Sequence, residues 1–504
     1  MTPQIATYSF VAVIIGLFWL TRDPEARVSK ALCLPLVWLW LTSSRSVTEW
    51  VAIAQTGRPL ASSLLSSATR SADRSNSYIE GTPLDRTVLI VLMTLALIVL
   101  IKRKRLGVLM GMNLPIVLFL LYAALTALWS DFPDVTIRRW FKAAGCLLMV
   151  MVVLSERDRD AAMRRLFVWA GFLLIPHSIL LIKYYPAIGR AYNRWTWIVS
   201  YVGVTTHKNS LGGICQVYGV TFVWHFITAY RDRLRADRMR HLIAYGAAIA
   251  MVLYLFWLAN SVTAQSVFLL ATALLVGAQM GVVVRKPWLV HMVMLLLVAV
   301  PFAALFLGVG GSALEGMGRD STLTGRTDIW ARVMSLVDNP ILGTGFESFW
   351  LGRRLAAMDR YQLGLNEAHN GYIEIYISLG WIGVVLLTIM IVRGYRKIIT
   401  LYRMNPGSGV FRLAFFLTVI VASYTEAAFR TESISWIAFL LMTKSTPEDR
   451  LLESARSASV TASGPTRLGP LSVESALRAP VLGVPSSTTS RPLMAGVAMT
   501  RPQR

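Results

Sequence analysis

Long continuous runs of apolar residues, separated by short polar segments, follow one another along most of the chain. About 20 apolar residues are needed for a helix to cross a hydrocarbon core of about 30 Å. Runs that reach or approach this length lie at 5–21, 31–44, 87–101, 107–129, 140–154, 165–182, 209–230, 242–259, 264–284, 287–309, 371–392, 409–425 and 428–443. They do not alternate, so they indicate helices and not the strands of a barrel. The pattern predicts an all-α polytopic integral membrane protein with about 12–13 transmembrane helices.

The polar segments between these runs differ in charge, and every second one is strongly basic. The basic loops are Arg22 to Lys30, Lys102 to Arg105, Arg157 to Arg165, Arg231 to Arg240, Arg285–Lys286 and Arg393 to Arg403. Because short cytoplasmic loops carry the excess of Lys and Arg, this side is assigned to the cytoplasm. The orientation of the N-terminus stays open, since it depends on whether the weak first and last runs both span.

The same pattern divides the chain into four parts. Residues 1–309 form an N-terminal transmembrane bundle, and 310–370 form a large periplasmic loop with turn signals and mixed polar and aromatic residues. Residues 371–443 form the C-terminal transmembrane helices. The segment 445–504 has no aromatic residue and is rich in Ser, Pro, Ala and Thr, so we expect a disordered cytoplasmic tail. No basic segment precedes the first run, so we expect no cleavable signal.

Composition narrows the function classes. The 504 residues include 50 Lys and Arg against 27 Asp and Glu, a net charge of +23, yet charged residues make up only 15% of the chain. Soluble domains carry about 25% charged residues, which excludes an ordinary cytosolic enzyme. A nucleic-acid-binding protein is also excluded, because the cations are split among short loops and do not cover one soluble face. No histidine pair has metal-ligand spacing, no nucleotide-binding loop occurs and the three cysteines show no zinc pattern, so we expect no metal and no cofactor.

Several cations break the topology rule, because they lie on the outer side. They are Arg138, Arg139 and Lys142 at the beginning of one span, His207 and Lys208 at the beginning of another, and Arg319 and Arg326 in the large loop. Cations at the membrane are costly and tend to mark function. Arginine makes forked hydrogen bonds to phosphate oxygens, so such a set would suit a phosphate-bearing lipid substrate. Snorkelling side chains or structural ion pairs are the alternative for each residue alone.

His369 is the best single candidate for chemistry. It lies directly before the span 371–392, beside Asn370 and two residues after Glu367. An imidazole has a pKa near 6.5 and can accept a proton at neutral pH. At a helix N-terminus the cationic form is disfavoured, so we expect His369 to stay neutral and act as a general base. A capping role at the interface is the alternative.

These motifs, taken in order, resemble those of the bacterial O-antigen ligase and exopolysaccharide polymerase superfamily. The matching elements are Gly81-Thr82-Pro83-Leu84-Asp85-Arg86; Trp129-Ser130-Asp131 with Pro133 and Arg138-Arg139; His207-Lys208-Asn209 with Leu211-Gly212; Leu323-Thr324-Gly325-Arg326-Thr327 with Gly343-Thr344-Gly345; and His369-Asn370 followed, after nine residues, by Gly380-Trp381-Ile382-Gly383. The resemblance covers roughly residues 80–440. The segment Asn260 to Gln265 lacks the arginine that ligases often show there, which favours the polymerase branch.

The resemblance implies the membrane glycosyltransferase fold with a helical cap from the outer loop, in the bacterial inner membrane. It implies a metal-independent transfer at the periplasmic face, with a glycan on undecaprenyl pyrophosphate as donor. The acceptor would be a second lipid-linked repeat unit for a polymerase of exopolysaccharide, or lipid A–core for a ligase. The predicted catalytic residues are His369 and Arg326, and the predicted substrate-binding residues are Arg138, Arg139, His207, Lys208, Arg319 and Asn370.

Membrane lipids are expected partners, and chain-length regulators and export proteins are further candidates. A transporter of lipid-linked sugars and a structural membrane scaffold are the remaining alternatives. A transporter would not need His369, and its typical pair of broken helices in two halves is not evident in the sequence. A scaffold would not need cations that break the topology rule.

Overall fold

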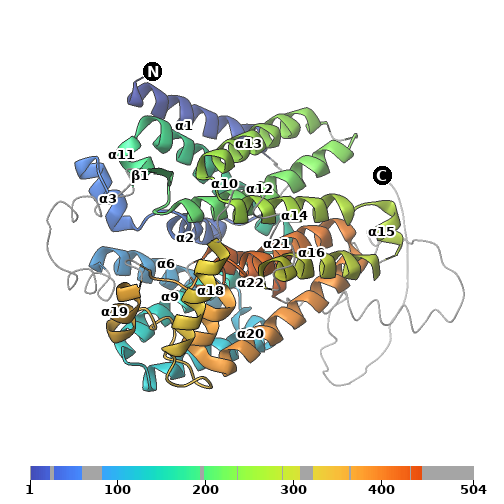
Figure 1. Ribbon diagram of the computed structural model, residues 1–504. Helices are drawn as coiled ribbons and strands as arrows, with labels where there is room; N and C mark the ends of the chain where they lie inside the picture. Colours follow the sequence, from blue (N-terminus) through green and yellow to red (C-terminus); the bar gives the residue numbers. More distant parts are fainter. Residues whose placement is uncertain are drawn as a thin grey trace, which may run out of the picture. The chain divides into compact units, whose positions relative to one another are not determined.

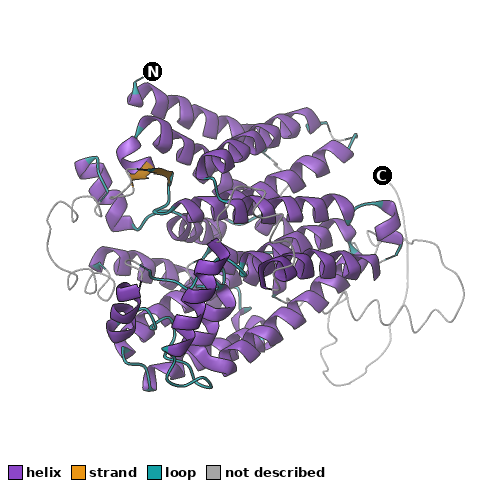
Figure 2. Cartoon of the chain, viewed as in Figure 1, coloured by secondary structure: helices purple, strands orange, loops and turns teal. Residues whose placement is uncertain are grey.

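The computed structural model describes residues 2–22, 28–59, 82–192, 198–234, 236–286, 288–306, 322–361, 365–431 and 433–444, and within these ranges it is almost entirely helical (Figures 1 and 2). The helices of the N-terminal half are α1 (Pro3–Leu20), α2 (Cys33–Ser43), α3 (Val47–Thr56), α6 (Pro83–Lys102), α7 (Leu106–Met112), α8 (Leu114–Leu125), α9 (Pro133–Leu154), α10 (Arg159–Tyr184), α11 (Pro186–Gly189) and α12 (Lys208–Arg231). Those that follow are α13 (Arg238–Ala259), α14 (Val262–Gly277), α15 (Gly281–Arg285), α16 (Trp288–Phe306), α18 (Thr322–Ser335), α19 (Gly352–Tyr361), α20 (Gly371–Met404), α21 (Pro406–Ala422) and α22 (Ile434–Thr443). Two short antiparallel strands, β1 (Arg190–Tyr192) and β2 (Val199–Tyr201), form the only sheet of the described residues.

The helices lie where the apolar runs predicted them, and the prediction of an all-α polytopic membrane protein is confirmed. Within the described residues, six helices are long and apolar enough to cross a membrane, or seven if the bent pair α7 and α8 forms one span. Five shorter apolar helices accompany them, so the predicted 12–13 spans require that these also cross. The run 107–129 was predicted as one span and is instead bent by 91° between α7 and α8. Pro115, at the start of α8, cannot donate a backbone hydrogen bond to the preceding turn, which favours a break there.

Central and peripheral helices differ in how much of their surface they bury. In the most apolar stretch of 18 residues, 78% of α10 and 72% of α12 is buried, but only 11% of α1 and 17% of α6. A helix that is apolar all round is either surrounded by protein or exposed to lipid. The bundle therefore has α10 and α12 in its core and presents the apolar surfaces of α1 and α6 to the membrane. Helix α12 packs against α13 and α14, and α14 and α20 both pack against α21 (Figure 1).

Helix α20 is interrupted at Gly380, and this break determines how the outer loop is attached. Gly380 has φ +60° and ψ −164°, which removes it from the helical ladder. The turn 340–345 replaces the lost partners: Trp381 N–H donates to the Pro340 carbonyl at 2.9 Å and Thr344 N–H donates to the Ile377 carbonyl at 3.0 Å. A β-carbon on Gly380 would lie 2.2 Å from the Ile341 oxygen, so no larger residue fits. Breaks of this kind are tolerated at membrane depth where neighbouring segments satisfy the freed groups.

Residues Met1–Pro447 form one compact unit. The predicted tail 445–504 lies outside the described residues. The proposed division at 309, 370 and 443 stays a prediction, although helices α18 and α19 do occupy the predicted large loop.

Candidate active site

The turn before α20 carries His369 and is fixed by the residue that follows it. Asn370 is the N-cap of α20, and its side-chain oxygen accepts the N–H groups of Tyr372 and Ile373 at 3.0 and 3.1 Å. Its amide nitrogen donates to the Tyr424 carbonyl at 3.2 Å, and the residue is only 3% exposed. Both the oxygen and the nitrogen of the Asn370 amide therefore make hydrogen bonds within the protein. The substrate contact predicted for it stays a prediction, and its observed role is to bind the His369 turn to the segment after α21.

His369 lies between two carboxylates. Its Nδ1 is 2.9 Å from Oε1 of Glu367 and 3.9 Å from Oε2 of Glu426, while Oε2 of Glu367 lies 3.6 Å from the Arg430 guanidinium. His369, Glu367 and Glu426 each keep 23–25% of the side chain exposed, so the group is accessible without being fully solvated. A chain of alternating charge therefore joins the two segments 367–370 and 426–430.

The two carboxylates change the protonation state that the sequence predicted. Burial alone would lower the pKa of His369, but Glu367 and Glu426 outweigh it and raise this pKa to about 9. Burial likewise would raise the pKa of Glu367, yet His369 and then Arg430 lower it to about 2. The expected neutral imidazole is therefore wrong for this arrangement, because the raised pKa favours the cationic form of His369 at pH 7.

The beginning of α12 contributes to the same site. His207 is the N-cap of α12, and its Nδ1 accepts the Asn209 N–H at 3.2 Å. Its pKa is lowered, first by the surrounding packing, although the residue is exposed at the surface; it also interacts electrostatically with Glu367, His369 and Glu426. The exposed Lys208 follows directly. The structure thus brings His207 within electrostatic range of His369, and Lys208 follows it in the chain.

Two of the predicted arginines reach the edge of this group through backbone contacts. Arg326, on α18, donates to the Thr425 carbonyl at 3.0 Å, next to Glu426. Arg139, on α9, donates to the Glu347 carbonyl, and the Glu347 carboxylate accepts the N–H and hydroxyl of Thr431 at 3.0 and 2.8 Å. Because Thr431 follows Arg430, this path connects α9 to the charged group.

The described contacts do not bring all of the predicted substrate-binding residues to His369. Arg138 is exposed on α9, and no described contact joins it to His369. Arg319 lies outside the described residues. These two substrate-binding assignments stay predictions.

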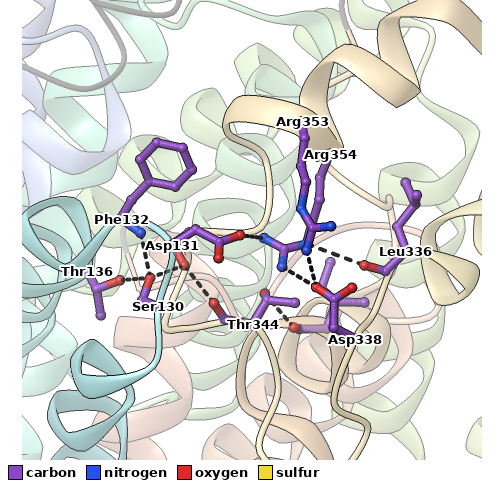
Figure 3. Close-up of polar contacts among 11 residues, drawn as sticks. Ser130, Asp131, Phe132, Thr136, Leu336, Asp338, Thr344, Arg353 and Arg354 are labelled. Atoms are coloured by element: carbon purple, nitrogen blue, oxygen red, sulfur yellow. Dashed lines mark hydrogen bonds and ion pairs between the residues drawn. The ribbon is translucent and has the colours of Figure 1, made fainter.

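A second polar network fastens the outer loop to the turn before α9 (Figure 3). Arg354 is 4% exposed and pairs with Asp131 at 2.7 Å and with Asp338 at 2.6 Å. The Ser130 hydroxyl accepts from Thr136 at 2.9 Å and lies 3.0 Å from the Ser348 hydroxyl. The Trp-Ser-Asp motif therefore holds the segment 338–354, which includes the Glu347 that Arg139 contacts.

Glu367, His369 and Glu426 also offer one ligand atom each within 4.8 Å of one another, a spacing that a metal ion could use. The surroundings fit a further cation poorly, because Arg430 already pairs with Glu367 and a metal ion would have to compete with it for that carboxylate. The expectation of a metal-independent site stays a prediction.

Sequence reasoning missed Glu426 and Arg430 as site residues. A signal was present, because both are ionisable residues at the edges of apolar runs, at 409–425 and 428–443, and such residues tend to be functional. Glu367 was noticed only as a neighbour of His369. Its role depends on the approach of residues 426–430, which no local pattern predicts.

Comparison with known proteins gives two matches. The family model described as O-antigen ligase matches residues 246–388, a region that contains Arg326, His369 and Gly380. The exopolysaccharide production protein ExoQ of Rhizobium meliloti (strain 1021) is 26% identical over 296 residues, which is 55% of this chain and 63% of the relative. The chain thus spans less than two thirds of that relative. Both matches confirm that the chain resembles the bacterial O-antigen ligase and exopolysaccharide polymerase superfamily.

Proposed function

We propose that the protein is a membrane glycosyltransferase that polymerises undecaprenyl-pyrophosphate-linked oligosaccharide repeat units into exopolysaccharide at the periplasmic face of the inner membrane. The observation that carries the proposal is the meeting of His369, Glu367, Glu426 and Arg430 with the beginning of α12. This group combines proton-accepting carboxylates with cations. A glycosyl transfer from a lipid diphosphate requires both.

The reaction forms one bond and breaks another. The acceptor hydroxyl oxygen bonds to the anomeric carbon of the donor sugar, and the bond from that carbon to the diphosphate oxygen breaks. The bonding electrons leave with the diphosphate, and the hydroxyl proton must pass to a base. His369 already holds its proton below pH 9, and Glu367 with a pKa of about 2 is a weak base. We therefore assign the base role to Glu426.

In this mechanism His369 acts as an imidazolium and not as the base predicted from the sequence. It would donate a charge-assisted hydrogen bond to the leaving diphosphate, together with Lys208 and Arg326. Groups that stabilise charge developing in the transition state are commonly worth about 10²–10³ in rate each. Arg139 would act at the edge of the site, through the segment that includes Glu347.

The second candidate is a ligase, because the matched family model is described as O-antigen ligase. A ligase would use the same donor and the same charged group, and would differ only in the acceptor. The test is to supply the purified protein in detergent with a lipid-pyrophosphate oligosaccharide, with and without lipid A–core and with a chelator present. Longer lipid-linked chains identify a polymerase, transfer only onto lipid A–core identifies a ligase, and neither product refutes the transferase proposal in favour of transport or a scaffold.

A further inference from the structure

A buried carboxylate on the first turn of α20 holds the turn that carries His369. Glu374 is only 6% exposed. Its Oε1 accepts the Ala368 N–H at 2.5 Å, and both of its oxygens lie 3.2 Å from the indole nitrogen of Trp350. Two donors, one from the backbone and one from a tryptophan, therefore converge on one ionisable group that takes no part in the proposed mechanism.

Both backbone polar groups of Ala368, the residue directly before His369, are hydrogen-bonded. Glu374 binds the N–H of Ala368, and the Trp330 indole donates to the Ala368 carbonyl at 2.8 Å. Ala368 itself is completely buried. Trp330 lies on α18 and Glu374 on α20, so the Ala368 backbone is fixed between two helices.

The backbone conformation of His369, with φ +50°, explains why the preceding residue must be held in place. A residue with a β-carbon adopts the left-handed region at a cost, and such a conformation persists only where the surroundings over-determine it. In this conformation the imidazole Nδ1 faces Glu367 and Glu426. Release of the preceding peptide would let His369 return to an ordinary conformation and turn away from the carboxylates.

We infer that Glu374 is a positioning residue for the reaction: its carboxylate, by accepting the Ala368 N–H, holds His369 against Glu367 and Glu426, while the Trp350 indole N–H is a second donor to the same carboxylate. The inference rests on the proposed function for its catalytic meaning. Its structural content is independent, since it predicts where the His369 side chain lies. A glutamine at this position is not equivalent, because its NH₂ group would replace one of the two oxygens, each of which lies 3.2 Å from the Trp350 indole donor.

The chemistry of the amide gives a specific test. Glu374→Gln keeps the size of the side chain but places an NH₂ group beside the two donors, so Ala368 N–H must compete with the Trp350 indole for the single remaining oxygen. Trp350→Phe removes one of the donors. In the double variant the amide oxygen is again free to accept the Ala368 N–H. A role in positioning therefore predicts a loss in Glu374→Gln, little effect in Trp350→Phe, and recovery in the double variant.

Two readouts keep the inference separate from the proposed function. The first is the titration of His369, observed by NMR with labelled histidine and assigned among the six histidines by comparison with His369→Gln. We expect it to shift from near pH 9 toward 6.5 in Glu374→Gln and to return in the double variant. The second is kcat for chain elongation, which should fall about 10²-fold in Glu374→Gln and recover with the titration. Melting temperature and monodispersity in detergent identify any variant that fails to fold.

An unchanged His369 titration in a folded Glu374→Gln protein would overturn the inference, as would a double variant that shows no recovery of the titration. If the titration moves as expected but the wild-type protein forms no glycan product, the proposed function fails and the placement of His369 by Glu374 still holds. If Trp350→Phe alone is as damaging as Glu374→Gln, the tryptophan acts by packing and the inference also fails.

Discussion

The protonation state of His369 makes a prediction that separates two mechanisms. With a pKa of about 9, the imidazole is neutral in about one molecule in a hundred at pH 7, because each pH unit changes the ratio tenfold. If His369 were the general base, kcat/KM would rise about tenfold per unit between pH 7 and 9, about 100-fold in all. If the imidazolium stabilises the diphosphate, kcat/KM should be level over this range and fall tenfold per unit above pH 9. We expect the second profile.

The assay is chain elongation from a labelled lipid-pyrophosphate oligosaccharide in detergent, with kcat/KM measured from pH 6 to 10. His369→Gln should lower the rate by about 10²–10³ and remove the alkaline limb. His291→Gln is the matched control, because His291 pairs with the Tyr395 hydroxyl at 2.8 Å, far along α20 from His369, and should keep the wild-type profile. A rate that climbs steadily to pH 9 would refute the imidazolium mechanism and restore His369 as the base.

The same residues give stability a dependence on pH whose direction follows from their pKa values. His369 titrates at 6.5 when unfolded and at about 9 when folded, so its contribution is complete below pH 6.5 and is lost as pH rises through 9. Glu367 moves from 4.5 to about 2, so its contribution is complete above pH 4.5 and is lost as pH falls through 2. The melting temperature of the wild type, relative to that of His369→Gln, should therefore decline between pH 6.5 and 9.

Three further predictions concern the surroundings of the site. Arg354→Met should lower the free energy of unfolding by about 1–3 kcal/mol, because it removes the buried guanidinium that pairs with both Asp131 and Asp338. Arg353→Met, at a side chain 68% exposed, should cost under about 0.5 kcal/mol. Thermal melts in detergent compare the two variants, and equal losses would contradict a structural role for the Arg354 pairs. Arg326→Lys should lower kcat/KM for the donor about tenfold, since lysine keeps the charge but loses the fork, and full activity would remove Arg326 from the site. Gly380→Ala should abolish folded, monodisperse protein in detergent, because a β-carbon there would lie 2.2 Å from a backbone oxygen. Gly277→Ala is the control, because a β-carbon there meets open space and the variant should fold normally. A well-folded Gly380→Ala protein would show that the break in α20 can be rebuilt.

Much of the helical architecture could be predicted, because in a membrane the length of an apolar run directly limits the length of a helix. The runs 165–182 and 209–230, for example, lie within α10 and α12. The break at Gly380 could not be predicted from hydropathy, since the run 371–392 is uninterrupted there. Its cause is tertiary: the turn 340–345 supplies the hydrogen bonds that the helix loses.

The cations proposed for the site could be named from the sequence, and its carboxylates could not. Cations on the outer side stand out because they oppose the charge rule, which is why Lys208 and Arg326 could be named from the sequence. Glu426 carries no such mark, and its importance comes from a distance of 3.9 Å to a histidine 57 positions earlier. The error about the charge of His369 has the same origin, because a local argument from the helix N-terminus omits carboxylates brought by folding.

The placement of these carboxylates also explains how a site for an anionic donor can contain anions at all. Two bare carboxylates would repel a diphosphate, but Glu367 is paired with Arg430 and His369, so its charge is already compensated before the donor binds. Among the described residues, no carboxylate lies within ion-pair distance of Lys208 or Arg326, so their charge would be available to the proposed donor. Proton transfer from the acceptor to Glu426 would then neutralise the second anion at the moment when negative charge appears on the leaving diphosphate. The site would therefore become more favourable to the diphosphate as the reaction proceeds, which is the condition for stabilising the transition state more than the bound substrate.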